Sequence, residues 1–85
     1  MNAMILRVDA PGRSNLYVSE PSPEVGDPEL VKDIRNGWVF TAKEAYRVIE
    51  RHFNGLACRV TAYELVGDPP TVDSFRGRVL YDMIS

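Results

Sequence analysis

Apolar and polar residues alternate along several short stretches of this chain, a pattern that predicts β-strands with one buried face. Including one short, wholly apolar run, the stretches expected to form strands are residues 4–9, 16–19, 38–40, 56–66 and 79–84. The first two flank a turn cluster at 11–15 and therefore predict a hairpin. In the longest stretch, the face expected to be buried consists of Leu56, Cys58, Val60 and Ala62.

A spacing of three and four residues between apolar positions replaces the alternation from Thr41 to Phe53 and predicts an amphipathic helix. Thr41 and Glu44 match a capping box at its N-terminus. Asn54-Gly55 matches a C-terminal stop, because one of the pair can adopt the left-handed conformation that ends helices. The face expected to be buried consists of Ala42, Ala45, Tyr46, Ile49 and Phe53.

A second, short helix of roughly two turns is predicted between Asp27 and Asn36. Asp27 would cap it and Pro28 would occupy its first helical position, where the missing N–H costs nothing. Asn36-Gly37 would end it. Its apolar face would consist of Leu30, Val31 and Ile34.

The expected element order is β-β-(α)-β-α-β-β, with one long and one short helix. Strands that neighbour one another in pairs around one long helix favour an α+β fold with a mostly antiparallel sheet of four to five strands. At 85 residues we expect a single small domain over 1–85, with an acidic, proline-rich connection at about 19–29.

Composition adds few constraints. The chain is 45% hydrophobic and 26% charged, as in ordinary globular domains, and its formal net charge of −2 does not indicate nucleic acid or membrane as a partner. The lone Cys58 excludes an internal disulfide framework and favours a reducing compartment. No leader is recognised before the first strand and no apolar run approaches membrane-spanning length, so the expected location is cytoplasmic.

Residues that commonly carry chemistry are sparse. His52 is the only histidine and Cys58 the only cysteine, so a metal site, which needs about three or four ligands, lacks candidates. His52 is expected at the boundary of the helix's apolar face, and Cys58 on a buried strand face. Phosphate-binding glycine loops and nucleophile elbows are not found. We therefore predict no catalytic residue, no cofactor and no metal, and we expect that the protein is not an enzyme.

Two groups of surface residues are candidates for partner binding. The first combines an acidic loop with strand aromatics, and its members are Glu20, Glu24, Asp27, Glu29, Tyr17 and Tyr63. Such a loop can compete for a basic groove on a partner, although a solvated linker and a tyrosine pair that stiffens the sheet are the structural alternatives. The second is a basic face, and its members are Arg47, Arg51, Arg59, Arg76 and Arg78. Glu44 and Glu50 interleave with the helix arginines and dilute this face.

The run from Trp38 to Val66 resembles small phage-encoded inhibitors, particularly anti-CRISPR proteins, in its pattern of elements. The pattern comprises the Trp38–Phe40 strand, the Thr41-capped helix with alanines at 42 and 45, and the strand from Leu56. The resemblance implies an inhibitor that occupies the nucleic-acid-binding surface of a bacterial effector complex without catalysis. It contains no shared motif from which a site residue could be transferred.

The resulting functional hypothesis is a noncatalytic protein-binding module of this inhibitor type, with a protein complex as partner and no membrane. Alternatives are a small nucleic-acid-binding domain that uses the arginine face, an accessory or antitoxin-like subunit, and a small enzyme centred on His52, Cys58 or Glu64. Because the last strand is expected at a sheet edge, it could pair with a second copy of the chain, and both monomer and homodimer stay open.

Overall fold

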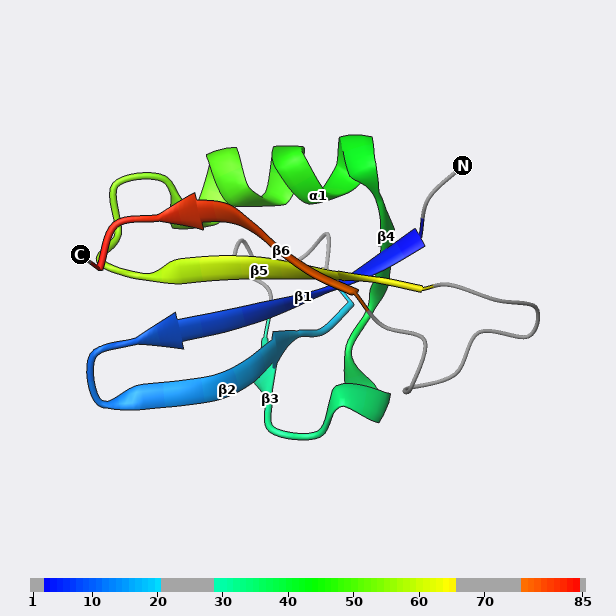
Figure 1. Ribbon diagram of the computed structural model, residues 1–85, viewed down its shortest axis with the longest axis horizontal. Helices are drawn as coiled ribbons and strands as arrows, with labels where there is room; N and C mark the ends of the chain where they lie inside the picture. Colours follow the sequence, from blue (N-terminus) through cyan, green and yellow to red (C-terminus); the bar gives the residue numbers. More distant parts are fainter. Residues whose placement is uncertain (1–2, 21–28, 66–75, 85) are drawn as a thin grey trace.

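An antiparallel β-sheet with a single helix packed against it forms the framework of the protein (Figure 1). The computed structural model describes residues 3–20, 29–65 and 76–84. The strands in these ranges are β1 (Ala3–Ala10), β2 (Arg13–Val18), β3 (Leu30–Val31), β4 (Val39–Thr41), β5 (Arg59–Glu64) and β6 (Arg76–Asp82). The α+β class and the mostly antiparallel sheet are thus confirmed, with β3 added to the expected strands.

The sheet has the strand order β3-β2-β1-β5-β6, and β4 pairs with the first residues of β1. All of these pairings are antiparallel. The expected hairpin is the β1–β2 pair, and the last strand lies at the end of the sheet order as expected. The long strand is shorter than predicted, because residues 56–58 belong to the loop that precedes β5.

The helical segment consists of α1 (Ala42–Val48), which continues directly into a π-helical turn, η2 (Ile49–Phe53). The capping box is present: the backbone N–H of Glu44 donates to Thr41 Oγ1 at 3.2 Å, and Thr41 N–H donates to Glu44 Oε1 at 3.3 Å. Gly55 adopts a φ of +88°, as the predicted stop requires. Both predicted ends of the helix are therefore confirmed.

The predicted second helix is wrong over most of its length. Leu30 and Val31 instead form β3, where they lie opposite Val18 and Tyr17 of β2. Among the residues of this stretch that the structure describes, from 29 to 36, only η1 (Ile34–Asn36) is helical, as a single 3₁₀ turn capped by Asp33. Pairing with β2 bonds the backbone and packs Leu30 against the core, whereas a two-turn helix would scarcely recover the cost of its nucleation. The predicted cap, Asp27-Pro28, lies outside the described residues.

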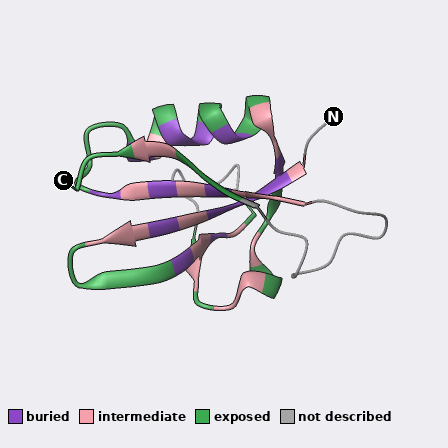
Figure 2. Ribbon diagram, in the orientation of Figure 1, coloured by how far each residue is buried: buried purple, intermediate pink, exposed green. Residues whose placement is uncertain are grey.

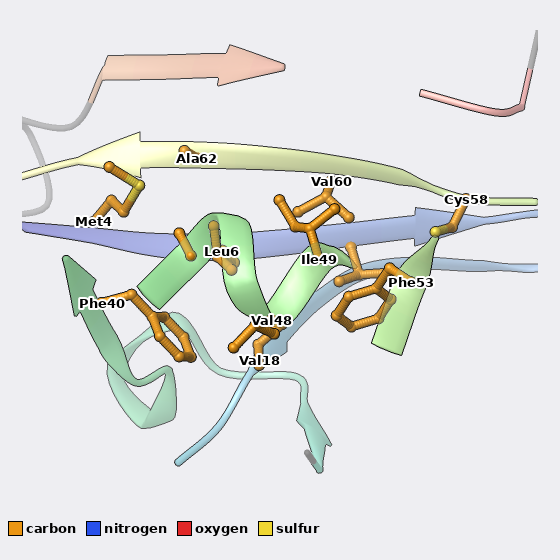
Figure 3. Close-up of a cluster of buried hydrophobic side chains, with 12 residues drawn as sticks. Met4, Leu6, Val18, Phe40, Val48, Ile49, Phe53, Cys58, Val60 and Ala62 are labelled. Atoms are coloured by element: carbon orange, nitrogen blue, oxygen red, sulfur yellow. The ribbon is translucent and has the colours of Figure 1, made fainter. Parts of the chain in front are cut away.

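The hydrophobic core lies between α1, η2 and one face of the sheet (Figures 2 and 3). It consists of Met4, Leu6, Val8, Val18, Phe40, Ala45, Val48, Ile49, Phe53, Cys58, Val60 and Ala62. Two predicted core residues are wrong, since Tyr46 and Leu56 are exposed. Val48 is buried instead of Tyr46 because β4 and β2 approach that flank of the helix, where Val48 lies beside Phe40 and Val18 (Figure 3). Leu56 is exposed because it lies in the loop before β5 and is therefore not part of the strand face that packs on the core.

Candidate functional site

His52 and Cys58, two of the three residues considered for a small enzyme, lie in different environments. Cys58 is part of the core beside Phe53 (Figure 3), and burial raises the pKa of its thiol. His52 is half-buried at the end of the helix and lines a hollow on its flank, described below. Among residues 3–20, 29–65 and 76–84, no group of three or more His, Cys, Asp or Glu side chains could hold a metal ion. These surroundings offer Cys58 no activation as a nucleophile.

Iodoacetamide is therefore expected to alkylate Cys58 slowly in the native protein. The thiol is 4% exposed and its raised pKa keeps the thiolate fraction small near neutral pH. We expect a native rate at least about 100-fold below the rate in denaturant, because reaction must wait for local opening. Mass spectrometry over time measures both rates. Native labelling within a few-fold of the denatured rate would show an accessible, reactive thiol.

The acidic candidates are placed only in part. Glu20 and Glu29 are exposed, whereas Glu24 and Asp27 lie outside the described residues. The backbone N–H and the hydroxyl of Ser19 both donate to the carbonyl of Glu29, each at 2.8 Å. Ser19 thereby holds together the two ends of the 20–28 segment beside the β2–β3 pair. Glu20 and Glu29 thus lie at the base of the predicted acidic loop.

The candidate tyrosines lie on the sheet face opposite α1, on either side of Arg7. Arg7 lies opposite Tyr17 in the strand register, and its Nη1 donates to the Tyr63 hydroxyl at 2.9 Å. This hydrogen bond and the ion pair with Asp9 at 3.2 Å raise the pKa of Arg7. The Tyr63 ring also covers Gly77, where an added Cβ would lie 3.2 Å from Cε1. These contacts, which join both tyrosines to Arg7, favour the structural alternative in which the aromatics stiffen the sheet.

The four arginines of the predicted basic face whose side chains are described are divided between different parts of the surface. Arg47 and Arg51 project from α1 and η2. Arg59 lies on the sheet face opposite α1, where its Nε is 3.2 Å from an Asp82 carboxylate oxygen. Arg78 lies on the other face, 3.7 Å from a Glu64 oxygen. Arg76 is in β6, but its side chain is outside the described part. The placed arginines therefore share no common basic face.

Four exposed apolar side chains lie on β6, directly after it, or in the loop that contacts its end, an arrangement that the strand pattern did not predict. We call Leu56, Val79, Met83 and Ile84 the β6 edge patch. Met83 N–H donates to the Cys58 carbonyl at 2.9 Å and Gly55 N–H donates to the Tyr81 hydroxyl at 2.8 Å, so the 54–58 loop lies against the end of β6 (Figure 1). No strand of the described ranges pairs with the outer side of β6.

A register shift explains the unexpected exposure on β6. The β5–β6 pairing is regular from Glu64 to Thr61 and then skips a residue, so that Val60 lies opposite Tyr81. Leu80 and Tyr81, although consecutive, both pack against the core. Val79 lies opposite Thr61 on the face away from α1 and is 52% exposed. Alternation read from the strand alone could not locate this bulge.

A hollow of about 200 Å³ lies on the flank of the helix that faces β4. Its lining consists of Phe40, Glu44, Arg47, Val48, Arg51 and His52. By helical periodicity, the exposed Tyr46 lies on the opposite flank. The sequence does contain a signal for this hollow, because Arg47 and Arg51 are four residues apart and Val48 is an apolar residue between them. The spacing of apolar residues predicted a buried helix face without Val48, so the hollow was not expected.

A scan against protein-family models, a search of curated proteins and a search of solved structures each returned no match. The resemblance of residues 38–66 to anti-CRISPR inhibitors stays a prediction from the sequence. In the part of the chain that the structure describes, no helix is both long and apolar enough to cross a membrane.

Proposed function

We propose that the protein is a noncatalytic protein-binding module that contacts its partner through the β6 edge. One observation carries the proposal: exposed apolar side chains of the β6 edge patch lie beside a strand whose outer backbone is unpaired within the described chain. Unpaired strand backbone is a template for a partner strand, and clustered apolar side chains stabilise such pairing by burial.

The charges around β6 favour protein over nucleic acid as the partner. Arg59 and Arg78 each lie within salt-bridge distance of a carboxylate, Asp82 and Glu64 respectively. Nucleic-acid binding depends on several arginines or lysines that neutralise phosphates together. Paired arginines on two different faces do not supply that arrangement.

A more specific version of this proposal is the inhibitor role that the sequence resemblance implies. An edge strand can block an effector complex by adding itself to that complex's sheet, without any chemistry. This form rests on the pattern of residues 38–66 alone. A contribution of the acidic loop stays a prediction, since only Glu20 and Glu29 of its acids are placed.

Two lysines introduced at the β6 edge test the proposal, because edge lysines are a natural obstacle to strand pairing. The V79K/M83K variant is compared with wild type in capture from bacterial lysate that has not been treated with nuclease, followed by affinity measurement with the identified partner. We expect at least a tenfold loss of affinity, as for truncation of a central apolar contact. V39K is the matched control, since Val39 is also a strand valine and is 45% exposed.

Three outcomes would contradict the proposal. The edge variant could retain wild-type affinity, V39K could lose as much as the edge variant, or the captured material could be nucleic acid. A second copy of the chain is a further candidate occupant of the edge. Sedimentation at micromolar concentration distinguishes it, because a homodimer formed through β6 would dissociate in V79K/M83K.

A further inference from the structure

The hollow beside α1 has an apolar floor and a basic rim. Phe40, 1% exposed, and Val48 supply the floor from β4 and α1. Arg47 and Arg51 are four residues apart, so they lie one above the other on the same side of the helix. The guanidinium groups are exposed and can turn toward a ligand above the floor.

The arginines at this rim differ from most others that are described. Arg7, Arg35, Arg59 and Arg78 each have an aspartate or glutamate oxygen within 4.0 Å. Within the described ranges, no carboxylate forms such a pair with Arg47 or Arg51. Glu44 also lines the hollow, but its carboxylate accepts from the hydroxyl of Thr41 at 2.8 Å and so is held at the helix cap. Positive charge therefore dominates the end of the hollow near Arg51.

The size of the hollow limits what it can hold. Pockets for drug-sized ligands and cofactors usually measure about 300–1,000 Å³. A volume of about 200 Å³ is smaller than that and suits one residue-sized group. Nucleotides and larger cofactors would extend beyond it.

We propose that this hollow binds a ligand in which a carboxylate is attached to one small apolar group. The carboxylate would accept hydrogen bonds from Arg47 and Arg51, since guanidinium forks match carboxylate geometry. The apolar group would cover Phe40 and Val48. The ligand is either a free small carboxylic acid or the C-terminal residue of a peptide, which share this chemistry. The site lies on the helix, away from β6, and does not depend on the function proposed above.

Nuclear magnetic resonance titration of the full chain tests the proposal with N-acetyl-leucine as the probe. We expect saturable shifts of the Arg47 and Arg51 Nε–H signals and the Val48 methyl signals, with a Kd of about 1–10 mM for a ligand this small. N-acetyl-leucine amide should bind at least about tenfold more weakly, because it lacks the charge-assisted hydrogen bonds. Inorganic phosphate should also bind more weakly, since it lacks the apolar group.

Matched variants locate the site. R47Q/R51Q should lose the response to N-acetyl-leucine, whereas R13Q, which removes an exposed arginine on β2, should retain it. V79K/M83K should also retain it, which keeps this test separate from that of the β6 edge. A tetrapeptide ending in leucine distinguishes the sources: tighter binding than N-acetyl-leucine indicates a peptide C-terminus, and equal binding indicates a free acid. Absence of saturation, equal binding of the amide, or an unchanged response in R47Q/R51Q would overturn the proposal.

Discussion

Replacing Phe40 with alanine is expected to lower the free energy of unfolding by about 3–5 kcal/mol, the usual cost of truncating a buried phenylalanine. Phe40 is among the largest fully buried side chains, at 1% exposed. It connects β4 to the core beside Val48 and Val18 (Figure 3). Because a domain of this size has a total stability of only about 5–10 kcal/mol, F40A would remove a large part of it.

Urea denaturation followed by Trp38 fluorescence measures this loss, since Trp38 is the only tryptophan. V39A provides the matched control on the same strand, because Val39 is exposed and its truncation should change stability by about 0.5 kcal/mol or less. F40L should fall between the two, as it retains part of the buried volume. A loss below about 1 kcal/mol in F40A would contradict the central position of Phe40 in the core.

Replacing Gly37 with alanine is expected to destabilise the protein by about 1–3 kcal/mol through overpacking. The backbone at Gly37 has φ −69° and ψ 143°, which any residue can adopt. On conformational entropy alone, alanine would therefore stabilise by about 0.4–1 kcal/mol. However, its Cβ would lie 2.8 Å from Ile5 Cγ2 and 3.1 Å from the Ile34 carbonyl oxygen, so the steric cost should exceed that gain.

A double variant tests whether the collision with Ile5 causes the loss of stability in G37A. I5L removes the Cγ2 methyl that meets the new Cβ while keeping the side-chain volume. Because the two residues would then no longer collide, G37A should cost at least about 0.5 kcal/mol less in the I5L background, and urea denaturation of the four proteins measures this coupling. A stabilising G37A, or strictly additive effects, would show that η1 does not press on β1 at this point.

Features determined by neighbouring residues could be predicted from the sequence. The helix cap depends on Thr41 and Glu44, three positions apart, and the helix end depends on Gly55, so both were found. The alternation of Val60 and Ala62 with more polar neighbours likewise predicted the buried face of β5, and these neighbours are half-buried. In each case the residues that make the interaction lie in the same short window.

Features determined by distant partners could not be predicted in this way. Asp27-Pro28 favours a helix locally, but Leu30 and Val31 pair with β2 instead. The rotation of the helix that buries Val48 depends on β4 and β2. The contacts that occupy Tyr63 join it to Arg7, 56 positions earlier in the chain. The exposed Val79 and the hollow beside Arg47 follow from the same long-range packing, and the candidate surfaces therefore emerged only from the fold.

Hydrogen exchange of the β6 backbone amides, with and without the captured partner, is the most direct test of binding through this edge. Outward-facing amides of a free edge strand exchange readily, and pairing with a partner strand protects them. We expect exchange of the outward-facing amides between Gly77 and Asp82 to slow by at least about tenfold on binding, with little change on the outer side of α1. Unchanged exchange along β6 in a complex that protects another surface would contradict the proposed role of this strand.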